Sequence, residues 1–455
     1  MTLTQPTKSE RSESAESVAI VGAGPAGSLL ALALAREGYS VDVYERRADP
    51  RAMLESGGRS INLGLSKRGM EALGMVGLLA DVLDRGVAMR GRVIHSLDGG
   101  VRFQPYGASS EEVLYSVDRN ELNLMLLERA AGYPTVRLHF DHRLVRMDKE
   151  RREIGLHAGG VNFTVQPRFV IGADGAFSTV RRELQHGERA DYHQEFLEWG
   201  YKEFTLPARP DGSSAVELTA LHLWPRSHCL IVSHPNRNGS HTLTLFLPFS
   251  GAESFASTRT ADEVEALFRK YFPDLVPLLP DYVEQWMNHE AASLVTTRTS
   301  PWRSGDWAVL VGDACHSVYP FYGQGMNSAF EDCVVLMRTL RGHPTDLVAA
   351  FSEYEQARRP HTDVLCELSK TNFVELRQKV RSPWFHARKR LDLAIHRLLP
   401  QWWLPLYTMI AHTTIPYADA LARARKQERI LVACSTFLML AAVGMSVIMA
   451  LRWHG

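Results

Sequence analysis

A glycine-rich turn between two apolar runs near the start of the chain constrains its fold more than any other feature. A strand-like run leads into G-x-G-x-x-G, a helix-like run follows, and a second strand-like run ends in an acid. Glycines allow a tight turn, the helix start offers free N–H groups to phosphates, and the acid can accept hydrogen bonds from ribose hydroxyls. This order predicts binding of a dinucleotide. The segments are Val18–Val21, Gly22, Gly24, Gly27, Ser28–Arg36, Tyr39–Tyr44 and Glu45.

Two later segments also end an apolar strand in glycine and aspartate. The second of them continues through a proline and another glycine turn into a helix. A carboxylate at such a strand end can accept from a ribityl hydroxyl, and the glycine turn can present N–H groups to an electron-rich ring. An ordinary turn explains any one of these elements, but not all three at strand ends. The segments are Val170–Arg182 with Asp174, Ala308–Val311 with Gly312 and Asp313, then Pro320, Gly323–Gly325 and Met326.

Three such elements in this order resemble the FAD-dependent aromatic hydroxylases, the single-component flavin monooxygenases, over positions 18 to 332. The resemblance implies that all three motifs bind FAD and that the second also serves NADPH. Only one G-x-G-x-x-G has the strand context, so no second nucleotide-binding domain is expected, unlike the two-Rossmann disulfide reductases. The cofactor residues expected are Gly22, Gly24, Ala26, Gly27, Glu45, Arg46, Arg119, Asp174, Gly312, Asp313, Pro320, Gly323, Gly325, Met326 and Asn327.

Several further segments are similar to the branch of this family that acts on kynurenine. That resemblance implies hydroxylation of L-kynurenine at ring position 3 with NADPH and O2, through a flavin C4a-hydroperoxide. No catalytic side chain and no metal are expected, because the cofactor carries the chemistry. Tyr322 departs from the branch, which has Phe or His there. The segments are Gly58–Leu63, Arg92–His95, Gln104–Gly107, Ser116–Arg119, Leu221–Arg226, Leu245–Phe249, Pro320–Asn327 and Pro405–Thr408.

The expected substrate residues match the parts of an aryl amino acid. A buried carboxylate needs a charged partner, and Arg92 lies in an otherwise apolar strand-like run. The alternatives stay open: a surface ion pair for Arg92, a membrane-interface position for Tyr407, and plain core packing for the phenylalanines. The set implied by the resemblance is Arg92, Tyr106, Phe246, Phe321, Tyr322, Asn372 and Tyr407.

The chain is expected to be α/β, with a Rossmann-like FAD-binding domain and an inserted antiparallel β-sheet that forms the substrate domain. Short β-rich runs bounded by turns predict this second sheet. Helical periodicity then appears over Leu347–Arg358, Val364–Lys379 and Phe385–Leu399. The expected divisions are a disordered tail at 1–17; the FAD domain at 18–76, 116–190 and 300–345; the substrate domain at 77–115 and 191–299; a helical region at 346–428; and a membrane anchor at 430–451.

The C-terminus predicts contact with a bilayer. Ile430–Leu451 contains no charged residue, and a helix of that length crosses about 30 Å of hydrocarbon. Basic residues concentrate before it, which predicts a catalytic body on the cytoplasmic side. The membrane is expected to be the mitochondrial outer membrane in a eukaryote or the cytoplasmic membrane in a bacterium. A buried core helix is the alternative, and the upstream apolar run Leu398–Ile415 is expected to be interfacial or to cap the pocket.

Composition excludes several functions. Lys+Arg and Asp+Glu both number 51, so no global field favours nucleic acid. The five cysteines form no C-x-x-C pair, which argues for a reducing compartment and against zinc. Two rival functions remain: a membrane-bound flavin hydroxylase or reductase of a quinone or lipid, and a non-enzymatic carrier on the same fold. The sequence leaves the oligomeric state open.

Overall fold

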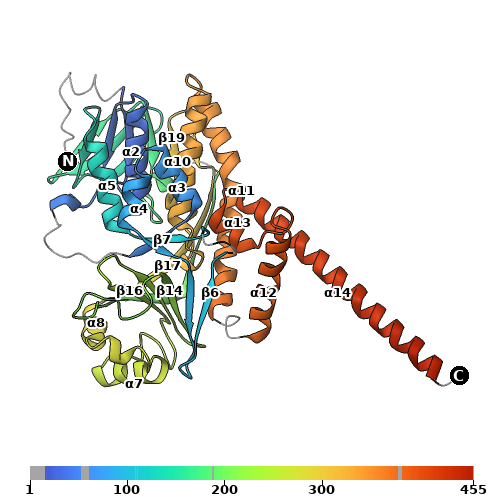
Figure 1. Ribbon diagram of the computed structural model, residues 1–455. Coiled ribbons are helices and arrows are strands. Elements are labelled where there is room, and N and C mark those ends of the chain that lie inside the picture. The colour runs from blue at the N-terminus through green and yellow to red at the C-terminus, as the bar shows by residue number, and fades with distance from the viewer. Residues whose placement is uncertain are drawn as a thin grey trace.

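The structure, a computed structural model, describes residues 16–52, 61–107, 109, 111–186, 189–377 and 382–453. Nearly all of the predicted disordered tail and part of the Gly58–Leu63 segment lie outside these residues. Figure 1 shows an α/β part that holds the N-terminal elements, a second part built on another sheet, and a group of C-terminal helices beside both. The last helix extends away from the rest of the molecule.

The first part contains a six-stranded sheet that brings the three predicted motifs together. Its strands pair in parallel except for the two at one edge. The strands that precede the motifs are neighbours and parallel, so their carboxyl ends lie at one edge of the sheet, which confirms the predicted Rossmann-like unit. In sheet order they are β18 (Arg303–Ser304), β19 (Ala308–Leu310), β12 (Phe169–Gly172), β1 (Val18–Val21), β2 (Val41–Tyr44) and β8 (Val136–His139).

Helices cover this sheet, and two small sheets flank it. Helix α2, whose leucines and alanines are buried on every side, packs against α5 and α10. The helices are α2 (Pro25–Arg36), α3 (Lys67–Met75), α4 (Leu79–Arg85), α5 (Arg119–Ala131), α6 (Thr179–Gln185), α9 (Asp313–His316) and α10 (Gly325–Gly342). The small sheets join β3 (Asn62–Leu65), β7 (Leu114–Asp118) and β4 (Val87–Met89), and β9 (Arg143–Asp148), β10 (Glu153–Ala158) and β11 (Val161–Val165).

The second part is a seven-stranded sheet that joins both predicted insertions. The prediction of a purely antiparallel sheet is wrong at one pair: β5 and β14 run parallel, with Arg92 opposite Leu221. They come from different insertions, so no hairpin imposes the antiparallel direction. The order is β17 (Ala292–Ser300), β13 (Asp191–Leu206), β16 (His241–Pro248), β15 (Leu230–Pro235), β14 (Ala220–Pro225), β5 (Gly91–His95) and β6 (Val101–Pro105).

Two helices that the sequence did not predict, α7 (Ala261–Tyr271) and α8 (Tyr282–Asn288), cover one face of this sheet. Phe268 and Trp286 from these helices pack with Phe204 in a separate buried cluster. A complete capping box at Thr260 and Glu263 begins α7. With that face filled by helices, the other face of the sheet is left to form a cavity wall.

The prediction of two separate helices, Leu347–Arg358 and Val364–Lys379, is wrong. Helix α11 (Leu347–Arg377) runs without interruption through Pro360. The contacts of Arg358 with α10 stabilise this helix and offset the cost of a proline in its interior. The Arg358 guanidinium is buried and binds Asp332 at 2.7 Å and Glu331 at 2.6 Å, both on α10. The next helix, α12, spans Pro383–Leu398, and the predicted helix end at Lys379 lies outside the described residues.

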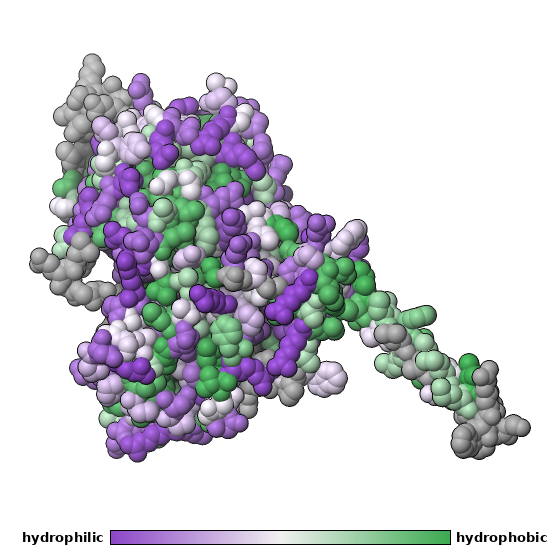
Figure 2. All heavy atoms as spheres, viewed as in Figure 1, coloured by the Kyte–Doolittle hydropathy of each residue, from purple (hydrophilic) through white to green (hydrophobic). Residues whose placement is uncertain are grey.

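The final segments form α13 (Leu406–His412) and α14 (Tyr417–Trp453). Met409 and Ile410 of α13 are fully buried with Tyr417 and Ala420 of α14. Beyond its base, α14 is apolar and projects from the body (Figure 2). Among the described residues, one helical stretch, Tyr417–Ser446, is long and apolar enough to cross a membrane.

We expect Arg358→Ala to destabilise the fold strongly, because it removes the arginine that pairs with the fully buried Asp332 and with Glu331. Removing one member of a buried ion pair costs about 3–5 kcal/mol. Chemical denaturation measures the free energy of unfolding. Arg341→Ala is the control, since Arg341 pairs with Glu37 on the surface and exposed pairs contribute about 0–1 kcal/mol. Similar small losses in both variants would contradict this reading of the α10–α11 contact.

Candidate functional site

A cavity of about 630 Å³ lies between the two large sheets. Every predicted substrate residue lines it, as do most of the predicted cofactor residues. Gly27, Gly312 and Asn327 do not line it and lie behind its wall. The cofactor residues on the wall are Gly22, Gly24, Ala26, Glu45, Arg46, Arg119, Asp174, Asp313, Pro320, Gly323, Gly325 and Met326.

The first glycine turn leaves room for a ligand where side chains would fill it. A Cβ atom at Gly22, whose φ is +103°, would lie 2.5 Å from the carbonyl oxygen of Ala173. A Cβ atom at Gly27 would lie 2.0 Å from the carbonyl oxygen of Gly22, so this glycine holds the turn against the helix. At Gly24, which begins α2, a Cβ atom would meet no protein atom within 4 Å. The backbone there faces open cavity, as close approach of a pyrophosphate requires.

Glu45 ties the second strand to this turn. Its carboxylate accepts from the backbone N–H of Ala23 at 2.9 Å and from Arg47 at 2.9 Å. Burial alone would raise the pKa of Glu45, but these hydrogen bonds outweigh it and lower the pKa. The acid is therefore ionised on the cavity wall, and its hydrogen bond to a ribose remains a prediction.

Asp174 holds the second motif together. Its carboxylate accepts from the backbone N–H groups of Thr179 at 2.7 Å and Val180 at 3.1 Å, and from the Ser178 hydroxyl. These bonds fix the turn between β12 and α6. Burial raises the pKa of Asp174 in spite of them. Asp174 therefore has a structural role in the turn and also lines the cavity. The sequence analysis predicted only its role in cofactor binding.

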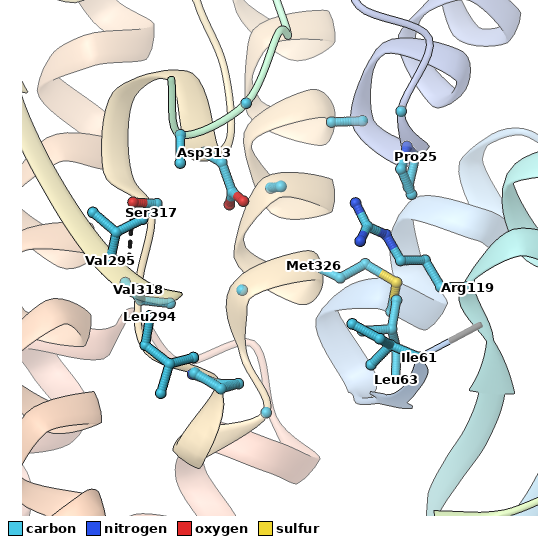
Figure 3. A pocket seen from close by; sticks show the side chains of 18 of the residues that line it. Pro25, Ile61, Leu63, Arg119, Leu294, Val295, Asp313, Ser317, Val318 and Met326 are labelled. Atoms are coloured by element: carbon cyan, nitrogen blue, oxygen red, sulfur yellow. Dashed lines mark hydrogen bonds between the residues drawn. The ribbon is translucent and has the colours of Figure 1, made fainter. Parts of the chain in front are cut away.

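Asp313 and Arg119 lie on opposite walls and direct their side chains into the space between them (Figure 3). Neither side chain has a hydrogen bond or ion pair within the described part of the chain. Surrounding protein raises the pKa of Asp313, while His316 and Arg119 act in the opposite direction. Arg119 suits a phosphate and Asp313 suits a sugar-like hydroxyl, so the pair fits the two polar ends of a flavin's ribityl pyrophosphate.

The start of α10 supplies backbone donors. Gly323 adopts a left-handed conformation with φ of +66° and precedes the helix, which begins at Gly325. The first N–H groups of a helix have no intrahelical partner and can meet an electron-rich ring. Asn327 fixes this end, because it accepts from Ser66 N–H at 2.9 Å and donates to Gly64 at 2.8 Å. Gly22, Gly24, Asp313, Arg119 and this helix end together fit FAD.

Cys315 and His316, which follow Asp313 on α9, do not line the cavity. His316 lies 2.5 Å from Asp332, which also binds Arg358 and the N–H of Gly312. Cys315 is buried, and burial raises the pKa of its thiol well above the ordinary value. Both side chains are therefore engaged in contacts within the protein and do not line the cavity. Cys315, His316 and Asp332 bring possible metal ligands within 4.8 Å of one another, but both Asp332 oxygens are already hydrogen-bonded.

Arg92 enters the other end of the cavity from β5. Its Nε is buried and has no hydrogen-bond partner in the described part of the chain. Its guanidinium carbon lies 5.2 Å from the ring centre of Tyr407 and 5.9 Å from that of Tyr106. Arg92 has no ion pair within the described part of the chain, so the alternative of a surface ion pair is not what the structure shows. Tyr407 on α13 lines the cavity, so this part of Leu398–Ile415 caps it.

Aromatic side chains form the adjoining wall. The Phe246 and Phe321 ring centres lie 5.0 Å apart, and Tyr322 stacks on Tyr407 at 6.0 Å. Asn372 lines the cavity and donates to the Phe321 carbonyl oxygen at 2.6 Å, and its own amide oxygen accepts no hydrogen bond from the described residues. The two phenylalanines pack in the core and also line the cavity. Their contact with a substrate stays a prediction.

The sequence analysis missed several lining residues on the large sheet. Tyr201, Val232, His234 and Thr244 face the cavity beside Phe246. The alternation of Val232 and His234 in the short run Leu230–Pro235 was the available signal, because alternate residues of a strand share a face.

Known proteins match this sequence over most of its length. Residues 15–368 match the FAD binding domain family. The chain is 56% identical over 429 residues, 94% of both chains, to the kynurenine 3-monooxygenase of Salinispora arenicola (strain CNS-205). It is 40% identical over 422 residues, 92% of both chains, to the enzyme of the same name from Stenotrophomonas maltophilia (strain K279a).

Solved structures share the fold. 2-Methyl-3-hydroxypyridine-5-carboxylic acid oxygenase matches with a TM-score of 0.67 at 22% identity, covering 81% of this chain and 94% of that chain. p-Nitrophenol 4-monooxygenase PnpA from Pseudomonas putida DLL-E4 matches with a TM-score of 0.67 at 17% identity, covering 84% and 94%.

The fold, the glycine turns and the family match define a FAD-dependent monooxygenase. Within that class the chain belongs to the kynurenine 3-monooxygenase family. The cofactor of this family is FAD, and its co-substrate is NADPH.

We expect Gly24→Ala to lower flavin content, because the added methyl group enters the space that the pyrophosphate needs. Absorbance of purified protein near the flavin maximum, divided by protein concentration, measures occupancy. Gly74→Ala is a matched control, since a Cβ atom there also meets nothing within 4 Å but lies on α3 outside the cavity wall. Full occupancy in Gly24→Ala and in Asp313→Ala would argue against the cofactor assignment.

Proposed function

We propose that this protein hydroxylates L-kynurenine at ring position 3, with FAD as cofactor and NADPH and O2 as co-substrates. The observation that carries the proposal is Arg92, a cation without an ion-pair partner in the described residues, on the wall of a largely apolar cavity. The relatives' names supply the substrate, and their identity of up to 56% supports its transfer to this chain.

The cavity walls suit the two halves of kynurenine. The guanidinium of Arg92 can bind a carboxylate through paired hydrogen bonds. Hydroxyls of Tyr106 and Tyr407 and the amide oxygen of Asn372 can satisfy the α-amino group. Phe246 and Phe321 offer an apolar wall to the aromatic ring. The head is thus fixed at one end, and the ring lies between aromatic faces.

FAD held by Gly24, Asp313 and Arg119 would supply the redox chemistry, that is, hydride acceptance from NADPH and activation of O2 for transfer to an electron-rich ring carbon. The protein itself positions the substrate ring and excludes water from the cavity. Tyr407 on α13 and the side chains of Tyr322 and Phe321 close the cavity on one side, and the seven-stranded sheet closes the other. Exclusion of water protects the activated oxygen from wasteful release as peroxide. No side chain needs to act as nucleophile.

The rivals explain the cavity less well. A quinone or lipid substrate has no carboxylate, and would leave Arg92 buried without a counter-ion. A non-enzymatic carrier would not require intact motifs at all three strand ends. Both rivals share the fold, so the ligand at Arg92 distinguishes them.

We expect Arg92→Ala to weaken binding of L-kynurenine by about 1.5–3 kcal/mol, the scale of a charge-assisted hydrogen bond. This corresponds to about a 10- to 150-fold rise in the dissociation constant. Titration of the flavin spectrum with kynurenine measures it. Arg102→Ala, an exposed arginine on β6, is the control. An unchanged dissociation constant in Arg92→Ala, with FAD bound, would remove Arg92 from the substrate site.

We also propose that α14 anchors the protein in a membrane with its body on the cytoplasmic side, the location expected from the sequence. Its outer part exposes Val432, Phe437 and Leu440 to solvent, which is unfavourable in water. Four basic residues precede this part and favour the cytoplasmic face: Arg423, Arg425, Lys426 and Arg429.

We expect deletion from residue 430 onward to release the protein from membranes and to leave FAD and hydroxylation intact. The contacts that hold α13 precede the cut: Tyr417 and Ala420 bury Met409 and Ile410, and Arg68 lies 4.1 Å from the Tyr417 ring centre. Fractionation and product analysis measure both outcomes. Deletion from residue 417 is the comparison and should lose coupled turnover. A 430 truncation that stays in the membrane pellet would contradict the anchor.

A further inference from the structure

His234 on β15 is a cavity residue that the proposed function has not used. It points from the same face of the sheet as Val232, and both line the cavity. Arg92 pairs with Leu221 across β5 and β14. The register of β14 on β15, with His222 opposite Ser233, continues with Leu221 opposite His234. Arg92, Leu221 and His234 therefore form one row across three neighbouring strands.

His234 is partly buried, and its imidazole has no hydrogen-bond partner in the described part of the chain. Burial lowers the pKa of His234 to about 4. At neutral pH the ring is therefore uncharged and carries one N–H donor and one acceptor. Its neighbour His241 on β16 differs, because it is bonded to Ser214 and Ser233 at 2.9 Å. The unused donor of His234 is available to a ligand.

Strand spacing sets how far this donor lies from the cation. Two strand spacings separate Arg92 from His234, about 10 Å between their backbones. In kynurenine, four bonds separate the carboxylate carbon from the ketone oxygen, a span of about 5 Å when extended. One hydrogen bond of about 3 Å at each end brings the total to about 11 Å. Both side chains rise from the cavity face of the sheet, so the spacing of their strands approximates the spacing of their donor atoms. We therefore expect a molecule held by Arg92 at its carboxylate to bring its ketone oxygen near His234.

We propose that His234 donates a hydrogen bond to the ketone oxygen of the substrate and thereby selects amino acids with an aryl ketone side chain. The inference rests on the proposed function. The opposite wall already provides for the flavin through Asp313, Arg119 and the start of α10, so the substrate is the partner left for His234. A site that offers a donor to a substrate acceptor discriminates against analogues that lack it.

The test compares L-kynurenine with its analogue in which a methylene replaces the ketone, 2-amino-4-(2-aminophenyl)butanoate. Flavin-spectrum titrations of the FAD-loaded protein give both dissociation constants. We expect the wild type to prefer kynurenine by about five- to tenfold, the scale of one hydrogen bond. His234→Leu should bind the two compounds equally. His234→Asn, which retains an N–H donor, should restore part of the preference.

Val232→Ala is the matched control on the same strand face: it should weaken both compounds and leave their ratio unchanged. A preference that persists in His234→Leu overturns the inference while the proposed function stands. Loss of FAD from His234→Leu with the preference intact assigns His234 to the cofactor and also overturns it. Failure of the wild type to bind kynurenine would remove the proposed function and this inference together.

Discussion

The parallel pairing of β1 with β12, and of β12 with β19, is the constraint on which the cofactor side of the molecule depends. It brings Gly22, Asp174 and Asp313 to one edge of a sheet, although they are spread over nearly 300 positions of the chain. The carboxyl ends of parallel strands are where such sheets bind ligands. The buried strands have no reactive side chains of their own, but their pairing places the turns that follow them side by side at one edge of the sheet.

Local signals were sufficient for much of this arrangement. A glycine turn needs only a few residues to be recognised, and Arg92 in the apolar run beside Val93 and Ile94 already indicated an unusual cation. Long-range contacts were not visible in the same way. The parallel pairing of β5 with β14, the helices α7 and α8, and the passage of α11 through Pro360 all depend on partners distant in the chain. For His234, alternation with Val232 indicated a shared face, but only the pairing of β14 with β15 and β5 shows that this face meets Arg92.

Two arginines illustrate how surroundings separate structure from function. Arg358 is buried against Asp332 and Glu331, so its charge is neutralised and it joins α10 to α11. Arg92 meets the faces of Tyr106 and Tyr407, which attract a cation but carry no charge. The first cation is satisfied by the protein alone. The second has no counter-ion within the described part of the chain. Its apolar run marked it as unusual in the sequence, whereas the burial of Arg358 depends on the packing of α11 on α10.

The single parallel junction in the large sheet also bears on how the enzyme forms. Arg92 reaches its place only when β5 pairs with β14, whose Leu221 lies 129 positions later in the chain. Contacts of such separation close large loops and form slowly compared with hairpins. During synthesis Arg92 is therefore made before β14, the strand that forms the neighbouring part of the cavity wall. Tyr407 on α13 lines the same cavity and is made later still, so a partly made chain holds no complete pocket.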